Sequence, residues 1–110
     1  MKYLITESQF DKVIFRYLDK QDFIVTGNDT SLFFINSEGD KYAQIRYLKE
    51  SGMCFIYIYL IKEISSFFSL SYDDSQEVIG KWVENTFQIE VKGVLPLGEP
   101  FKKELRIPSN

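Results

Sequence analysis

The feature that most constrains the fold is an uncharged apolar run at residues 53–61, Met-Cys-Phe-Ile-Tyr-Ile-Tyr-Leu-Ile. Its β-branched and aromatic residues favour a β-strand. The run is too short to cross a bilayer as a helix, which needs roughly 20 apolar residues. Alternation places Met53, Phe55, Tyr57 and Tyr59 on one face and Cys54, Ile56, Ile58 and Leu60 on the other. We therefore predict a buried central strand with one aromatic and one mostly aliphatic face.

Composition limits the classes of protein to which this chain can belong. The 110 residues fit a single domain, and 45% hydrophobic with 26% charged residues is typical of a folded globular protein rather than a disordered one. The net charge is −3. A mildly acidic chain lacks the positive surface of a general nucleic-acid binder, so the charge disfavours that class of partner.

The residue types that are absent are equally informative. Histidine does not occur, which removes Ser–His and Cys–His nucleophiles and every His-containing metal motif. Cys54 is the single cysteine and has no partner for an internal disulfide, and the N-terminus lacks a signal-peptide pattern. We therefore expect a cytoplasmic protein that is not an enzyme.

The first predicted element is an amphipathic helix over residues 6–20. Thr6 followed by Gln9 forms a capping-box pattern, and Ile5 with Phe10 forms a hydrophobic staple. Apolar residues then recur at helical spacing. They are Phe10, Val13, Ile14, Tyr17 and Leu18.

Four short apolar segments follow, at residues 23–26, 32–36, 42–48 and 53–60, separated by turn residues. They predict an antiparallel meander. If the turns close symmetrically, Val25 faces Leu32, Phe34 faces Ala43, and Ile45 faces Ile56. The resulting core face is apolar throughout. It holds Phe23, Val25, Leu32, Phe34, Ala43, Ile45, Tyr47, Cys54, Ile56 and Ile58.

The opposite face is too apolar for a fully solvated sheet. It collects Ile24, Phe33, Ile35, Tyr42, Gln44, Arg46, Phe55, Tyr57 and Tyr59. Two alternatives follow: the C-terminal part of the chain covers this face, or the face is at least partly an open contact surface.

The C-terminal half predicts two more helices and a strand or hairpin. Residues 61–69 have helical spacing, with an extended segment through residue 72 as the rival, and residues 74–86 form a second amphipathic stripe that includes Trp82 as a core anchor. Residues 87–93 alternate as a half-buried strand that ends at Gly93. Residues 95–100 predict a turn, and residues 101–107 predict a returning edge strand. The predicted fold is α+β: an N-terminal helix, a four-stranded antiparallel meander, two helices, and a C-terminal strand or hairpin.

Two groups of residues suggest chemistry. Asp73, Asp74 and Glu77 are the densest carboxylates and could suggest a Mg²⁺ or Ca²⁺ site, but we prefer to interpret them as the N-cap and first turn of a helix. Cys54 lies on the aliphatic face, where its pKa should stay high. We therefore predict no catalytic residue, no metal site and no cofactor.

The opening residues 2–9, Lys-Tyr-Leu-Ile-Thr-Glu-Ser-Gln, resemble the N-termini of many small uncharacterised proteins of tailed bacteriophages. The resemblance implies a viral accessory protein in a bacterial host cytoplasm. It implies no fold, activity or functional residue.

The sequence therefore predicts a protein-binding module that acts on a host protein or self-associates through the aromatic face. Tyr, Phe and Arg are enriched in protein interfaces. The predicted binding residues are Tyr42, Arg46, Tyr57 and Tyr59. The alternative is single-stranded nucleic-acid binding by base stacking on the same face. No membrane partner is expected.

Overall fold

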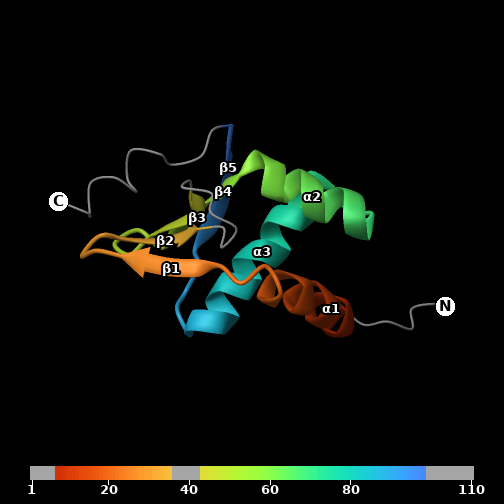
Figure 1. The fold of residues 1–110 in the computed structure, drawn as a ribbon, viewed down its shortest axis with the longest axis horizontal. Coiled ribbons are helices and arrows are strands. Elements are labelled where there is room, and N and C mark those ends of the chain that lie inside the picture. The colour runs from red at the N-terminus through yellow and green to blue at the C-terminus, as the bar shows by residue number, and fades with distance from the viewer. Residues whose placement is uncertain (1–6, 36–42, 99–110) are drawn as a thin grey trace.

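The computed structural model describes residues 7–35 and 43–98. Over these ranges of the chain, one helix precedes four strands, and two further helices and a fifth strand follow them (Figure 1). They are α1 (Glu7–Asp19), β1 (Ile24–Gly27), β2 (Ser31–Ile35), β3 (Ala43–Leu48), β4 (Met53–Tyr57), α2 (Ile58–Phe68), α3 (Tyr72–Phe87) and β5 (Gly93–Leu97). The predicted α+β class is confirmed. The helix predicted at residues 6–20 is described from Glu7 to Asp19, and its capping residue Thr6 lies outside the described residues.

The strands form one sheet in the order β1-β2-β3-β4-β5. The first four strands pair antiparallel, which confirms the meander, and β5 pairs parallel to β4. The predicted pair Ile45 and Ile56 is confirmed, whereas Phe34 lies opposite Val25 and Ile45, two residues from each predicted position. A shift of two residues leaves each side chain on its predicted face, because strand side chains alternate.

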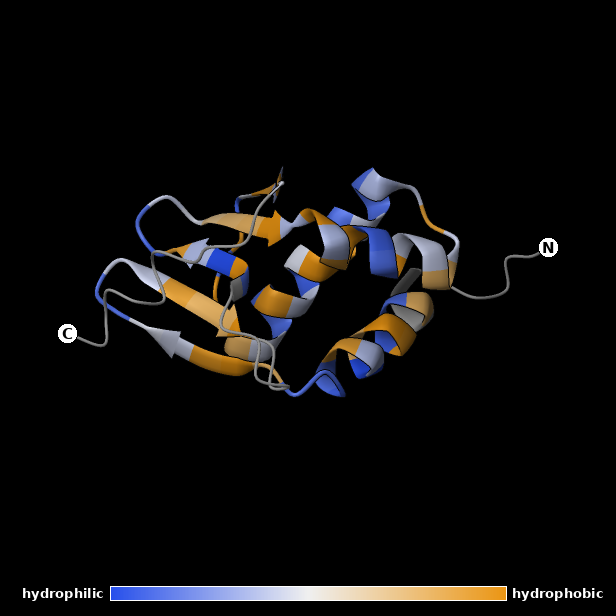
Figure 2. Ribbon diagram, turned by 45° about the horizontal axis from the view of Figure 1, so that its top comes forward, coloured by the Kyte–Doolittle hydropathy of each residue, from blue (hydrophilic) through white to orange (hydrophobic). Residues whose placement is uncertain are grey.

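The predicted core face of the sheet is the face that the helices cover. Trp82 and Phe87 of α3 place their rings 5.8 and 5.1 Å from the Phe34 ring of β2. The α1 and α2 helices flank α3, and hydrophobic residues alternate with hydrophilic ones along all three helices (Figures 1 and 2). One buried cluster joins the sheet to every helix. It consists of Ile14, Leu18, Phe34, Ile45, Cys54, Ile56, Leu60, Ile61, Ile64, Val78, Ile79, Trp82 and Val83.

The prediction that the central strand reaches residue 60 is wrong, because β4 ends at Tyr57 and α2 begins at Ile58. Residues 58–61 are apolar at every position, so they satisfy the helical and the strand periodicity equally. In the helix, Leu60 and Ile61 both enter the core. Packing against α3 therefore decides the junction, and Ile58 and Tyr59 do not belong to the sheet.

The C-terminal strand lies later in the chain than predicted, at Gly93–Leu97. Residue 87 is the last residue of α3, residues 88–92 form no strand, and β5 spans residues that were predicted in part as a turn. Phe87 at the end of α3 packs on the core, as do Ile89 and Val91 of the connection that follows. The Val91 amide donates to the Glu84 carboxylate at 3.0 Å rather than to a strand. The edge strand predicted at residues 101–107 lies outside the described residues.

The helix predicted from residue 74 begins earlier. Ser71 is its N-cap, and the Ser71 hydroxyl accepts a hydrogen bond from the Asp74 amide at 3.0 Å. Asp73 and Asp74 lie in the first turn, where the helix dipole favours negative charge. The prediction that Asp74 caps this helix is therefore wrong, because Ser71 is the cap, whereas the first-turn position of Asp73 and Asp74 is confirmed.

Candidate functional site

The face of the sheet away from α3 carries a row of side chains that crosses four strands. Phe33 lies opposite Arg46, Arg46 opposite Phe55, and Phe55 opposite Leu95. The next pair along β4 and β5 is Tyr57 with Leu97. The parallel addition of β5 therefore widens the predicted aromatic face with two leucines.

Three of the four predicted binding residues lie at this face or on its rim. The Arg46 guanidinium lies 5.6 Å from the centre of the Phe33 ring, and its Nε donates to the Ser31 hydroxyl at 3.4 Å. The rings of Tyr57 and Tyr59 are 5.1 Å apart in an edge-to-face arrangement, although Tyr59 belongs to α2. Tyr42 lies outside the described residues.

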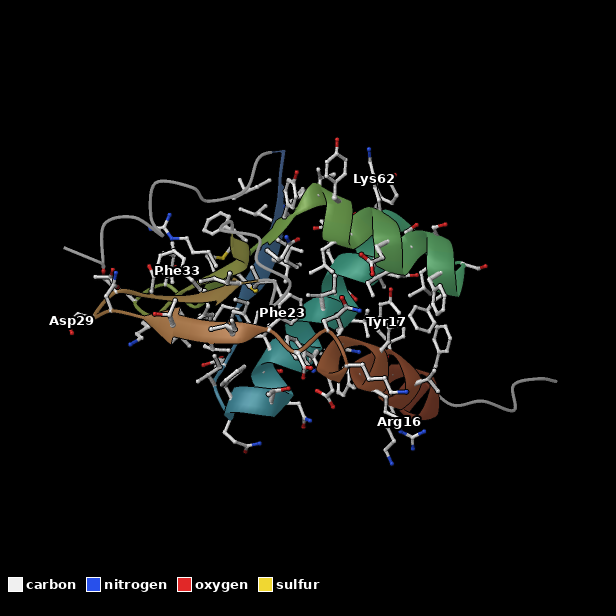
Figure 3. All side chains as sticks on the ribbon, viewed as in Figure 1. Arg16, Tyr17, Phe23, Asp29, Phe33 and Lys62 are labelled. Carbon is white, nitrogen blue, oxygen red and sulfur yellow. The ribbon has the colours of Figure 1, made fainter. Side chains whose placement is uncertain are left out.

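We call this region the outer patch. It consists of Phe33, Arg46, Phe55, Tyr57, Tyr59, Lys62, Leu95 and Leu97. The Lys62 ammonium lies 5.3 Å from the centre of the Tyr59 ring, and Figure 3 shows Lys62 projecting outward from α2. Each end of the outer patch therefore combines an aromatic ring with a cation, an attractive arrangement worth about 0.5–1 kcal/mol at an exposed ring such as that of Tyr59.

The outer patch is closed at its centre and open at its rim. Phe33 is only 1% exposed, with Phe55 and Leu97 packed against it. By contrast, Tyr59 is 60% and Leu95 45% exposed. Of the C-terminal part that was one predicted cover of this face, β5 extends the sheet at its edge, and residues 99–110 lie outside the described residues. The accessible part of the patch is the rim around Tyr59 and Leu95.

The electrostatic character of this face differs from that of the whole chain. Among the described strand residues, none of those on the outer face is Asp or Glu, whereas Arg46 lies on it and Lys62 adjoins it. The chain as a whole carries a net charge of −3. The carboxylates of the first turn of α3 project from a helix that packs on the other face of the sheet.

A second exposed aromatic group, at the helical end of the molecule, was not predicted. Phe67 of α2 is 66% exposed and stacks on Tyr17 of α1 with ring centres 4.9 Å apart. The adjacent residues Phe67 and Phe68 indicate that one of the two rings is exposed. Neighbouring residues of a helix point about 100° apart, so both rings cannot face one narrow core. Phe68 packs against the core, which leaves Phe67 outside.

The thiol and the charged side chains that could take part in a reaction serve structural roles. Burial raises the pKa of the Cys54 thiol to about 12, as the sequence predicted in direction. A groove of about 440 Å³ between α3 and β5 contains Glu84, which accepts from the Val91 amide, and Lys81, which lies 3.5 Å from Asp11. Among the residues described, no group of His, Cys, Asp or Glu is arranged to hold a metal ion.

No helix within the described ranges is both long and apolar enough to span a membrane. Comparisons with protein-family models, with curated proteins and with solved structures yield no match to this chain. The geometry of the outer patch is therefore the basis for assigning a function.

Proposed function

We propose that this protein is a non-enzymatic protein-binding module whose outer patch binds an acidic, partly apolar segment of another protein. The observation that carries the proposal is the accessible rim formed by Tyr59 and Leu95, next to the cations Arg46 and Lys62. Interfaces are enriched in Tyr and Arg, and complementary charge selects partners.

The closed centre supports a protein segment over a nucleic acid. Base stacking needs an accessible ring face, and the Phe33 ring is buried beneath Arg46. A partner side chain, by contrast, needs only the rim, where Tyr59 offers an apolar ring and Leu95 an aliphatic surface. The resemblance of residues 2–9 to proteins of tailed bacteriophages supports a bacterial host protein as the partner.

The test uses a random-peptide display library selected against the full chain. We expect enrichment of peptides that combine Asp or Glu with apolar residues. Their affinity should fall about tenfold or more with Tyr59→Ala, which removes the exposed anchor, and should weaken with Lys62→Gln and with added salt. Phe67→Ala is the matched control, because it removes an exposed aromatic ring from the same helix outside the patch.

Two results would contradict the proposal. One is a selection that enriches no peptide, and the other is equal binding of the enriched peptides to wild type and Tyr59→Ala. Titration with labelled single-stranded oligonucleotides at low salt tests the alternative partner. Oligonucleotide binding that is lost in both Tyr57→Ala and Arg46→Ala would replace protein binding with nucleic-acid binding.

A further inference from the structure

The strand β1 is an edge of the sheet whose outer side pairs with no other described strand. Ile24 is 54% and Val25 38% exposed, although successive side chains point to opposite faces. Both faces of the strand are therefore accessible near its start, and neither exposed side chain belongs to the outer patch.

The hydrogen-bond pattern shows which backbone groups of β1 point outward. The Asn28 amide donates to the Ser31 carbonyl at 2.9 Å, so these residues form a hydrogen-bonded pair at the turn. Because such pairs alternate along an antiparallel ladder, Thr26 and Phe33 form the next one. Val25 and Gly27 therefore direct their N–H and C=O groups away from β2.

The adjacent ladder agrees with this assignment. The Lys49 amide donates to the Thr30 carbonyl at 2.9 Å, which places Thr30 in a hydrogen-bonded pair with β3. By alternation, Leu32 and Phe34 then point their backbone groups toward β3 and not toward Gly27 and Val25, their partners in β1.

Of the usual protections against strand pairing, β1 has, within the described part of the chain, its short length of four residues and no other. Natural edge strands carry charged side chains, proline or bulges that block a further strand. The residues of β1 are Ile, Val, Thr and Gly. The other edge, β5, contains Pro96, which has no backbone N–H and interrupts the row of donors.

We propose that two copies of this chain associate through antiparallel pairing of β1 with β1. An antiparallel strand pair is self-complementary about a two-fold axis, so the same outward groups on each copy satisfy one another. This strand carries no charge to oppose an identical one. A second copy is therefore the occupant that matches the edge in both backbone pattern and charge.

The register follows from the same groups. Centring the pair on Val25 lets the N–H and C=O of Val25 bond to those of Val25 in the second copy, and it sets Ile24 opposite Thr26. β-branched cross-strand pairs stabilise sheets. The contact between the two β1 strands involves four residues from each copy and therefore buries little surface. Stable interfaces bury about 1,200–2,000 Å². The dimer is therefore weak and forms at high protein concentration.

The test measures the mass of the full chain by sedimentation over a wide concentration range. We expect the wild-type mass to rise toward that of a dimer, and the rise to be lost in Val25→Lys, which places a charge at the centre of the pair, and in Val25→Pro, which removes an outward N–H. Val13→Lys is the matched control, because Val13 is an exposed valine of α1 away from the sheet. Added salt should strengthen the dimer, because each copy is acidic.

Amide hydrogen exchange provides a readout that needs no variant. Protection of the Val25 and Gly27 amides should rise with protein concentration, while the Thr26 amide, bonded within the sheet, is protected at all concentrations. A monomer at the highest concentration would overturn the proposal, as would a dimer that persists in Val25→Lys. A dimer lost in Tyr59→Ala but kept in Val25→Lys would assign self-association to the outer patch instead. If the Val25→Pro variant does not fold, the mass of Val25→Lys and the amide exchange of the wild-type protein test the proposal.

Discussion

Three titratable side chains of this chain bind their protons more tightly in the folded state than in the unfolded state. Burial raises the pKa of Cys54 to about 12 from 9.0. Burial, followed by the hydrogen bond and charge of Glu63, raises the pKa of Tyr17 to about 12 from 10.0. Burial also raises the pKa of Tyr47, whose hydroxyl donates to the Glu90 carbonyl at 2.8 Å. In all three cases the folded chain disfavours the charged form.

The sign of the resulting pH dependence follows from proton linkage. Above about pH 9 the unfolded chain releases protons that the folded chain retains, so the free energy of unfolding falls as pH rises. The stabilisation is fully present below pH 9.0 and is lost between there and about pH 12. We expect a lower urea midpoint at about pH 10 than at neutral pH.

The variant Cys54→Ala separates the thiol from the tyrosines. Its stability at neutral pH is lower because a core side chain is truncated, but its decline with alkaline pH should be shallower than that of wild type. An identical pH slope in both proteins would contradict the assignment to Cys54. Thiol-reactive reagents should modify Cys54 at neutral pH only through unfolding, because the side chain is buried.

Between elements, the contact of α3 with β5 depends on a glycine. A Cβ placed on Gly80 would lie 2.7 Å from Cγ1 of Val94, closer than carbon atoms approach in proteins. The absence of a side chain at this point lets α3 lie directly against the parallel strand. A glycine in a helix interior usually lowers stability, so packing accounts for its presence here.

We expect Gly80→Ala to lower the free energy of unfolding, even though alanine improves helix propensity by about 1 kcal/mol, because overpacking costs about 1–3 kcal/mol. Adding Val94→Ala should recover part of the loss by removing the atom that clashes. Gly98→Ala is the control, since a Cβ there meets no atom within 4 Å. The explanation fails if chemical denaturation shows Gly80→Ala to be as stable as wild type.

Across the described part of the molecule, one buried cluster connects the sheet with α1, α2 and α3. Trp82 of α3 is central to it, and its indole Nε1 donates to Asp19 of α1 at 2.9 Å. No helix can leave the cluster without exposing apolar area. Small domains of this kind usually unfold in one cooperative transition.

We therefore expect the urea unfolding curves from Trp82 fluorescence and far-ultraviolet circular dichroism to coincide. Ile56→Ala, at a fully buried position, should shift both curves together by about 2–5 kcal/mol, whereas Ile24→Ala, at an exposed position, should change stability by less than about 0.5 kcal/mol. A fluorescence transition at lower urea than the dichroism transition would contradict this expectation, because the packing around Trp82 would then be lost before the helices unfold.

The sequence by itself determined α1, the four-stranded meander and the core face of the sheet. These features rest on local periodicity, and the alternation around Ile45 and Ile56 admits one buried face. It also indicated Arg46 and Tyr57 of the outer patch, because both lie on strands whose alternation is unbroken.

Only the tertiary structure decided where the central apolar run changes from strand to helix, and where the last strand pairs. At residues 58–61 every side chain is apolar, so local pattern cannot distinguish the two periodicities, and burial against α3 selects the helix. The parallel pairing of β5 joins residues far apart in sequence, and no local pattern encodes it. Leu95 belongs to the outer patch because β5 pairs with β4, and Lys62 belongs to it because α2 begins at Ile58. Such a surface depends on which distant segments the fold brings together.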